Sequence, residues 1–287
     1  MAVGVKKGDE VITTSLTYVS TVEVILRLGA TPVFADIKKD TAIIDENDIK
    51  LKISKKTKAI IVVSLYGIIP NIKEIKKFSK KIKIIEDAAQ SFGSIYNKNY
   101  SCNLADIGCT SFYPTKNLGG YGDGGAIFTN SKKLADKMFL IRNHGEKKKY
   151  DTTILGICGR LDELQAAILN EKFKLFAREN KIRISNGKKL QKILSRFSIK
   201  INKKSLVSYN TFPILIKNRA DIIKKLKIEK IQYNIYYPKP IHKQKFLNLN
   251  VKLPNTEKFC QQILNLPCHP YLTEKYFLRV KKIINDN

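Results

Sequence analysis

The feature that most constrains the fold is a continuous apolar run, Ala59-Ile-Ile-Val-Val-Ser64, which has no polar alternation. Such a run is typical of a strand that other elements cover on both faces. Similar short runs occur at residues 11–14, 31–35, 82–86, 107–112 and 126–129. Helical patterns lie between or after them, at residues 17–28, 72–81 and 131–141. This alternation predicts an α/β structure built from βαβ layers.

The chain changes character after a long helical pattern over residues 161–196. A strand-like run at 209–216 and a helical pattern at 220–227 follow it. A length of 287 residues suits one large domain and one smaller domain. We therefore predict a large domain over residues 1–175 and a smaller C-terminal α+β domain over residues 176–287.

The net charge of +28 raises the question of nucleic-acid binding. The lysines are spread through the helical patterns beside Ile and Asn, and arginine is rare among the basic residues. This distribution favours a general compositional bias, so we expect no nucleic-acid partner. The excess positive charge would still attract an anionic substrate such as a nucleotide diphosphate.

Membrane and metal partners are not expected either. No apolar run approaches the roughly 20 residues that span a bilayer, and no secretory signal is present, so we predict a cytoplasmic location. The five cysteines form no Cys-x-x-Cys pair and no spaced Cys/His pairs, which disfavours a metal site.

Two residues at strand ends point to a specific chemistry. Lys116 follows a strand-like run and precedes a glycine-rich loop, and Asp87 ends the run Ile84-Ile-Glu-Asp87. Ligands of open α/β sheets bind at the carboxyl ends of the strands. A lysine amine and a carboxylate are the two protein groups that pyridoxal phosphate (PLP) requires, one to form the Schiff base and one to pair with the ring nitrogen. Ala89 lies on the same strand face as Asp87 and leaves room for a flat ring, and Gln90 offers an amide to a ring oxygen.

The loop Gly120-Tyr-Gly-Asp-Gly-Gly125 formally matches the dinucleotide-binding pattern G-x-G-x-x-G. That pattern should open a helix, whereas the strand-like Ala126-Ile-Phe-Thr129 follows here. A dinucleotide-dependent dehydrogenase is therefore disfavoured.

Eight segments together resemble one known family, in family order and over essentially the whole chain. They are Gly8-Asp-Glu-Val-Ile12, Leu28-Gly-Ala-Thr-Pro-Val-Phe34, Glu86-Asp-Ala-Ala-Gln-Ser-Phe-Gly93, Asp106-Ile-Gly-Cys-Thr-Ser-Phe-Tyr-Pro-Thr-Lys-Asn-Leu-Gly119, Arg142-Asn-His-Gly145, Arg160-Leu-Asp-Glu-Leu-Gln-Ala-Ala167, Tyr237-Pro-Lys-Pro-Ile-His242 and Leu266-Pro-Cys-His-Pro270. With them the chain resembles the DegT–StrS family of PLP-dependent sugar-nucleotide aminotransferases. The resemblance implies the aspartate-aminotransferase fold (fold type I), with a mostly parallel central sheet in the large domain.

The resemblance also implies roles for individual residues. It makes Lys116 the Schiff-base lysine and Asp87 the partner of the ring nitrogen, places Gln90 near the ring oxygen, and gives the Ser111 hydroxyl to the cofactor phosphate. Tyr18 matches the aromatic residue that stacks on the ring, although a core aromatic on a helix would account for it equally well.

Two further residues, Arg160 and His242, lie in motifs that border the substrate or the partner subunit in relatives. Surface pairing on a helix and loop packing explain them equally well.

Two departures from the family pattern stand out. Met1 to Gly8 align with the end of a helix that further residues precede in relatives, so we expect the chain to lack an N-terminal segment with a phosphate-binding turn. Cys158 stands where relatives commonly have Asn, two residues before Arg160. Both departures would weaken the binding of the cofactor phosphate.

The function implied by the resemblance is transfer of an amino group, from glutamate on the family's habit, to a keto group of a nucleotide-linked deoxysugar. The segments around residues 120–125 and 160–165 resemble those of enzymes acting on 3-keto sugars. Such an enzyme would serve the synthesis of surface polysaccharides and act as a homodimer. One alternative is a catalytically weak or regulatory member of the family. Another is a PLP-dependent sugar dehydratase, which Lys116 disfavours because that enzyme has histidine at this position.

Overall fold

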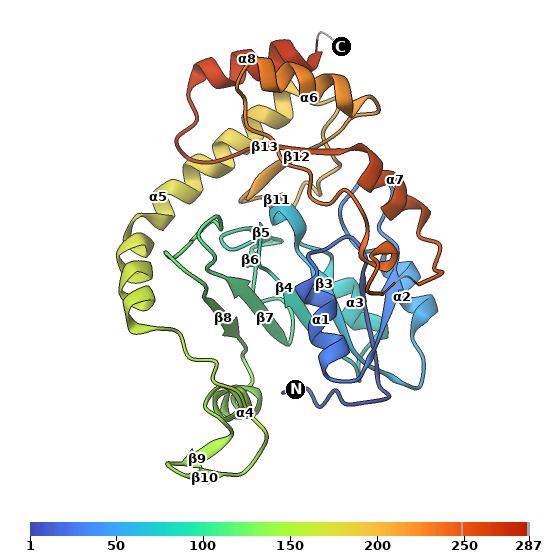
Figure 1. The fold of residues 1–287 in the computed structure, drawn as a ribbon, viewed down its shortest axis with the longest axis vertical. Helices are drawn as coiled ribbons and strands as arrows, with labels where there is room; N and C mark the ends of the chain where they lie inside the picture. Colours follow the sequence, from blue (N-terminus) through green and yellow to red (C-terminus); the bar gives the residue numbers. More distant parts are fainter. Residues whose placement is uncertain (248, 286–287) are drawn as a thin grey trace.

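The computed structural model describes residues 1–247 and 249–285, and its centre is a six-stranded sheet of order β2-β1-β3-β4-β7-β8 (Figure 1). The strands are β1 (Glu10–Thr14), β2 (Thr31–Ala35), β3 (Thr57–Val63), β4 (Lys83–Asp87), β7 (Ile107–Ser111) and β8 (Gly125–Phe128). The first five pair in parallel, and only β8 runs antiparallel, beside β7. The predicted α/β class with a mostly parallel sheet is confirmed.

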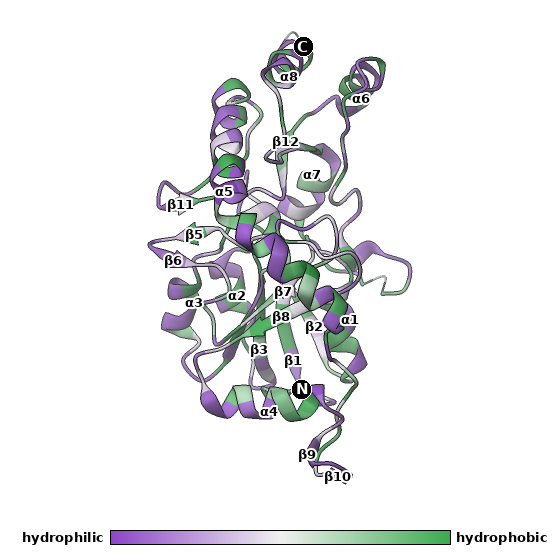
Figure 2. Ribbon diagram, turned by 90° about the vertical axis from the view of Figure 1, so that its left-hand side faces the viewer, coloured by the Kyte–Doolittle hydropathy of each residue, from purple (hydrophilic) through white to green (hydrophobic). Residues whose placement is uncertain are grey.

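Helices cover both faces of this sheet. The helices α1 (Ser20–Arg27), α2 (Glu46–Lys52) and α3 (Ile72–Phe78) connect the first strands, with α1 on one side and α2 and α3 on the other (Figures 1 and 2). Residues Ala59–Val63 of β3 are all buried, as expected of an apolar strand covered on both faces. The centre of the sheet therefore has no side that faces solvent. This accounts for the apolar strands that alternate with helices in the sequence.

The second half of the chain begins with the 31-residue helix α5 (Glu163–Ile193), which extends from beside β8 to the C-terminal elements (Figure 1). Beyond it, β12 (Thr211–Leu215) pairs antiparallel with β13 (Ile263–Pro267). The helices α6 (Arg219–Ile228), α7 (Pro254–Gln262) and α8 (Glu274–Asn285) surround this pair. One buried cluster unites residues of both halves, including Leu16 and Tyr66 with Phe212 and Leu264. The two-domain division at residue 175 stays a prediction.

The remaining elements are short, except for α4 (Lys132–Arg142), which buries none of its residues. They are η1 (Leu65–Gly67), β5 (Ile95–Tyr96), β6 (Asn99–Tyr100), β9 (Glu146–Lys148), β10 (Asp151–Thr152), β11 (Ser205–Leu206) and η2 (Ile241–Lys243). No helix in the described ranges is long and apolar enough to cross a membrane.

The structure departs from the sequence-based expectations in two ways. The first helix begins at Ser20 and not at Thr17, and Thr17 precedes it with a buried side chain whose Oγ1 lies 2.8 Å from Thr21 Oγ1. The sequence also gave no prediction for the elements α2, α7, β13 and α8. In α8 the buried residues Phe277, Val280 and Ile284 are spaced as on one helix face, a pattern that the nearby prolines obscured.

Candidate active site

The ends of the parallel strands bring the predicted site residues to one edge of the sheet. Asp87 is the last residue of β4, and Ser111 is the last residue of β7. The two strands are neighbours, with Asp87 in register with Cys109. The segments that follow β1, β3, β4 and β7 therefore emerge together, where open α/β sheets bind their ligands.

Hydrogen bonds from two sides hold the Asp87 carboxylate. Thr21 Oγ1 donates to Asp87 Oδ2 at 2.7 Å from the first turn of α1. The backbone N of Ala89 donates to Asp87 Oδ1 at 3.2 Å. Each carboxylate oxygen keeps a lone pair for a further donor, so the group is fixed in position and can still accept an N–H from a ligand.

Lys116 lies half-buried in the loop between β7 and β8. A turn forms there, with Lys116 N donating to Tyr113 O at 2.9 Å. Burial lowers the pKa of the Lys116 amine, because it disfavours the charged form, while the Asp87 carboxylate acts in the opposite direction. The structure therefore brings the amine and the carboxylate within electrostatic range of each other, and burial dominates the balance at the amine.

The residues around Lys116 are anchored to the second half of the chain. Asn117 is buried, and its Nδ2 donates to Ser208 O at 2.9 Å and to Ser208 Oγ at 2.8 Å. Asn210 Nδ2 donates to Thr115 O at 3.0 Å. A Cβ at Gly119 would lie 2.5 Å from Pro114 O, so only glycine permits this close approach of the backbone. The loop thus presents Lys116 from a fixed base.

Gln90 has a defined orientation beside Asp87. Its Oε1 accepts a hydrogen bond from Tyr66 N at 2.9 Å, which turns its Nε2 the other way. That Nε2 approaches the Tyr237 hydroxyl at 3.5 Å. Ala89, also predicted for the site, is half-buried next to it and carries only a methyl group.

Tyr18 and Tyr237 form an aromatic boundary to this group. The Tyr18 side chain is 60% exposed, which is incompatible with the alternative of a core aromatic. Its ring centroid lies 6.3 Å from that of Tyr237. Burial, and then the charge of Asp87, raises the pKa of the Tyr237 hydroxyl, so this group is a neutral donor and acceptor at physiological pH.

Ser111 stands at the start of the Lys116 loop. Its Oγ accepts from Tyr113 N at 3.1 Å and so supports the turn before the lysine. Because an accepting hydroxyl keeps its proton for another partner, Ser111 can still donate to an anionic group.

The structure does not join Arg160 to these residues. Arg160 is exposed in the segment between α4 and α5, and no hydrogen bond or ion pair among the described residues connects it to Lys116 or Asp87. Cys158, at the position that departs from the family pattern, is exposed as well. The side chains of Arg160 and Cys158 are therefore accessible to solvent or to a partner.

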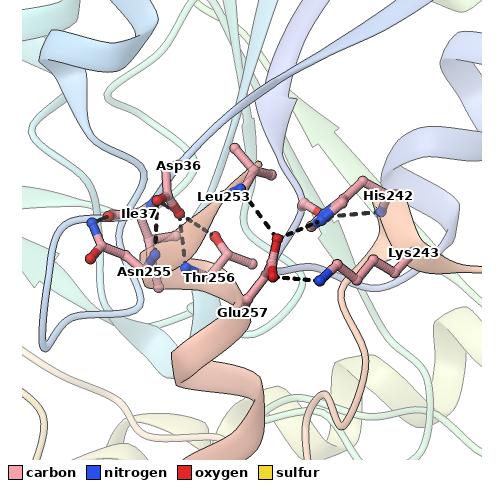
Figure 3. A network of polar contacts seen from close by, with 9 residues as sticks. Asp36, Ile37, His242, Lys243, Leu253, Asn255, Thr256 and Glu257 are labelled. Carbon is pink, nitrogen blue, oxygen red and sulfur yellow. Dashed lines mark hydrogen bonds and ion pairs between the residues drawn. The ribbon is translucent and has the colours of Figure 1, made fainter. Parts of the chain in front are cut away.

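His242 lies inside a network that joins α7 to the sheet (Figure 3). Its side chain is fully buried, with Nδ1 2.8 Å from Ser15 Oγ and Nε2 3.4 Å from Glu257 Oε1. Burial lowers the pKa of the imidazole. In the same network Asp36 accepts from the backbone N of Asn255 and Thr256, at 2.9 and 2.8 Å, and so caps α7. These contacts give His242 a packing role between the two halves of the chain.

The residues gathered here fit PLP. A half-buried amine with a lowered pKa can bond to an aldehyde, and a fixed carboxylate can pair with a ring nitrogen. An oriented amide, a small methyl group and an exposed aromatic ring complete the set. This donor set matches a flat, polar, aromatic ligand with an aldehyde.

Sequence reasoning missed three residues of this site, namely Thr21, Tyr66 and Tyr237. Thr21 follows Tyr18 at the i, i+3 spacing, a signal that could have placed its hydroxyl on the same face of the predicted helix as Tyr18. Tyr237 begins one of the segments that resemble the family, and Tyr66 lies two residues after the strand-like run 59–64, but neither pattern indicated a contact with Gln90.

The chain matches known proteins throughout its length. The model of the DegT/DnrJ/EryC1/StrS aminotransferase family matches residues 1–285. The UDP-2-acetamido-2-deoxy-3-oxo-D-glucuronate aminotransferase of Pseudomonas aeruginosa is 41% identical over 285 residues, which cover 95% of this chain and 77% of the relative. A pleiotropic regulatory protein of Geobacillus stearothermophilus is 40% identical over 286 residues, with 96% and 77% covered.

A solved structure that contains a bound cofactor is also similar to this chain. The crystal structure of NtdA from Bacillus subtilis, with bound cofactor PMP, has a TM-score of 0.91 to this chain and 31% sequence identity. The match covers 99% of this chain and 69% of that one. At this identity and coverage the similarity extends to the fold of nearly every described element.

Proposed function

The chain belongs to the DegT/DnrJ/EryC1/StrS aminotransferase family, and we propose that it aminates the 3-keto group of a UDP-linked sugar. The protein is a sugar aminotransferase, and PLP is its cofactor. Support for the substrate class comes from the Pseudomonas aeruginosa relative, whose name specifies a UDP-linked 3-oxo sugar. Glutamate is our proposed amino donor, and the synthesis of surface polysaccharides in the cytoplasm is the proposed setting.

The observation that carries the proposal is that the Lys116 amine lies within electrostatic range of the Asp87 carboxylate at the end of β4. When bound, PLP supplies an electron sink for the negative charge that forms on the substrate carbon. The lowered pKa of Lys116 increases the fraction of unprotonated amine at neutral pH. Its Nζ would therefore bond to the cofactor aldehyde and, once released, would carry a proton from the amino-acid carbon to the cofactor carbon that bears the nitrogen.

The neighbouring residues would hold the cofactor around that amine. The Asp87 carboxylate, fixed by Thr21 and Ala89, would keep the ring nitrogen protonated. Gln90 Nε2 would donate to the ring oxygen, and the Ser111 hydroxyl to the phosphate. The exposed ring of Tyr18 would stack on the cofactor. We assign no substrate contact to the buried His242, and we place Arg160 at an interface with the partner subunit.

A transamination assay tests this proposal. The purified protein with PLP and glutamate should aminate a UDP-linked 3-keto N-acetylhexosamine, detected by mass spectrometry. Lys116→Ala should reduce the rate by at least about 10²-fold, the scale of one acid–base group. Lys81→Ala changes an exposed lysine that follows α3 in the sequence, and it should leave the rate unchanged. Undiminished transamination by Lys116→Ala would overturn the proposal.

The regulatory alternative has one specific observation in its favour, the 40% identity to the pleiotropic regulatory protein. A regulator without catalysis would bind PLP and form no aminated product from the UDP-linked 3-keto N-acetylhexosamine. The same assay separates the two functions, since it reports product and cofactor binding independently.

We also propose a homodimer. In support, α4 buries none of its residues, and the neighbouring β8 leaves Ile127 57% exposed. Figure 2 shows hydrophobic segments alternating with hydrophilic ones along α4. A second copy packed on this side would cover apolar side chains that the single chain leaves in water.

A further inference from the structure

Tyr66 and Tyr237 enclose Gln90 in a closed circle of contacts. Tyr66 N donates to Gln90 Oε1 at 2.9 Å, and Gln90 Nε2 approaches Tyr237 Oη at 3.5 Å. A third contact completes this circle, because the Tyr66 hydroxyl donates to the backbone carbonyl of Tyr236, the residue before Tyr237. Three segments far apart in sequence thus meet around one carboxamide.

The Tyr66 side of this circle of contacts is rigid. Tyr66 is completely buried and adopts a left-handed backbone conformation with φ 56°. The next residue, Gly67, has φ 93°, and a Cβ there would lie 2.5 Å from Ser208 O. The backbone N that holds Gln90 therefore has little freedom to move, and Gln90 Oε1 is fixed with it.

The Tyr237 side comes from the C-terminal half of the chain. Tyr237 begins the segment Tyr237-Pro-Lys-Pro-Ile-His242, and Ile241 N donates to Ser15 O at 3.0 Å at its other end. The Tyr237 ring also contacts the ring of Tyr18. The segment is therefore tied to the large sheet at both ends, with the Tyr237 hydroxyl directed at Gln90.

We propose that Tyr237 is a positioning residue, which fixes the Gln90 carboxamide so that its N–H faces the ring oxygen of the bound cofactor. This inference rests on the proposed function. A primary amide has two N–H donors, so Nε2 can donate one to Tyr237 and the other to a ligand. The distance of 3.5 Å is long for a hydrogen bond, and such contacts shorten when a ligand completes the site.

A double-mutant cycle on PLP affinity tests the proposal. Tyr237→Phe removes the hydroxyl and keeps the ring that packs on Tyr18. It should weaken PLP binding by about 2- to 12-fold, the range expected for one hydrogen bond. Gln90→Ala should weaken binding at least as much, and the double variant should be no weaker than Gln90→Ala alone.

Tyr236→Phe is the matched control. It removes the hydroxyl of the adjacent tyrosine and leaves the backbone carbonyl that Tyr66 contacts, so it should bind PLP like the unchanged protein. Unchanged affinity in Tyr237→Phe, or fully additive losses in the double variant, would overturn the proposal.

A spectroscopic readout separates positioning from a general structural effect. The visible absorption band of the bound cofactor titrates with the proton that the Schiff-base nitrogen shares with the ring oxygen, and a donor to that oxygen favours loss of this proton. Tyr237→Phe and Gln90→Ala should both move this titration to higher pH, and Tyr236→Phe should not. An unmoved titration in Tyr237→Phe contradicts the positioning role.

Failure of the proposed function is distinguishable from failure of this inference. If the unchanged protein binds no PLP, the proposed function is overturned. The contact between Tyr237 and Gln90 is then tested by a double-mutant cycle on the free energy of unfolding in urea. Non-additive losses of unfolding free energy for Tyr237→Phe and Gln90→Ala support the contact, and additive losses overturn it.

Discussion

At the scale of single residues, Lys116 is subject to two opposing effects. Burial removes water from its amine and lowers the pKa, while the Asp87 carboxylate raises it. The net lowering means that the folded chain holds this proton less tightly than the unfolded chain does. A site that needs a free amine at neutral pH thereby costs the folded state some stability.

This balance predicts a stability change in Lys116→Met. The unfolded lysine titrates near its ordinary value of 10.5, and the folded one titrates lower. Below the folded pKa the charged amine destabilises the fold in full, and this penalty disappears as the pH rises from the folded pKa to 10.5. Lys116→Met should therefore melt at a higher temperature than the unchanged protein at pH 7, with a difference that shrinks towards pH 10.

Differential scanning calorimetry over this pH range checks the prediction. Lys81→Met, at an exposed position, serves as control and should show no comparable pH-dependent gain. A lower melting temperature for Lys116→Met at pH 7 would contradict the account of a penalised amine.

Residue-level prediction had a local signal where a strand end marked the residue. Lys116 and Asp87 each follow an apolar run, and that position alone suggested a ligand site. Thr21 and Tyr237 carry no such mark, and Tyr66, which does follow an apolar run, was still missed, because these contacts with Asp87 and Gln90 arise only when separate segments pack together. His242 shows the converse, since its place in a family motif gave no sign that it is fully buried.

At the scale of elements, the loop between β7 and β8 depends on close backbone packing. Gly120 N donates to Phe112 O at 2.7 Å, and Gly119 lies against Pro114. The loop can therefore hold Lys116 in one place only while these glycines stay free of side chains.

Gly119→Ala should disturb this loop. Its Cβ would meet Pro114 O at 2.5 Å, a backbone atom that cannot move aside without shifting the turn before Lys116. Such overpacking typically costs about 1–3 kcal/mol, measured as the free energy of unfolding in urea, and PLP affinity should fall with it.

Gly159→Ala provides the comparison, because its Cβ would make ordinary contacts from 3.4 Å. It should change stability by less than about 1 kcal/mol. Equal stability of the Gly119→Ala and Gly159→Ala proteins would show that the loop tolerates side chains at its turn.

Element prediction depended on the strength of the local pattern. The apolar run of β3 and the long helix α5 were predicted because burial on both faces and sustained helical periodicity leave clear signals. The missed strand β13 follows α7 without a connecting loop, and it is stabilised by pairing with the distant β12. Long-range pairing of this kind leaves no trace in the neighbouring sequence.

At the scale of the whole molecule, apolar surface lies unevenly around the sheet. The edge strand β8 exposes Ile127 and Phe128, and the adjacent α4 exposes Phe139. The opposite edge is formed by β2. The proposed homodimer would cover the β8 edge.

Multi-angle light scattering should therefore give twice the chain mass of 32.7 kDa. Ile127→Asp, which places a charge on the exposed face of β8, should shift the protein towards the single-chain mass, because burying an unpaired carboxylate is costly. Leu51→Asp alters a residue that is 83% exposed on α2, away from β8, and should stay dimeric. A single-chain mass for the unchanged protein would contradict the proposed dimer.

The family resemblance, more than composition, carried the prediction for the molecule as a whole. Eight motifs in order implied the fold type and the aminotransferase activity, and the fold and the family match agree with both. The net charge of +28, taken alone, would have directed attention to nucleic acids.

The central claim is that the Lys116 amine and the Asp87 carboxylate bind the two ends of one ligand. A crystal structure of the protein after incubation with PLP and reduction with borohydride tests it most directly. Continuous density should join Lys116 Nζ to the cofactor, with the ring nitrogen at hydrogen-bond distance from Asp87. A ring nitrogen that faces another group, or a cofactor attached to a different lysine, would contradict the claim.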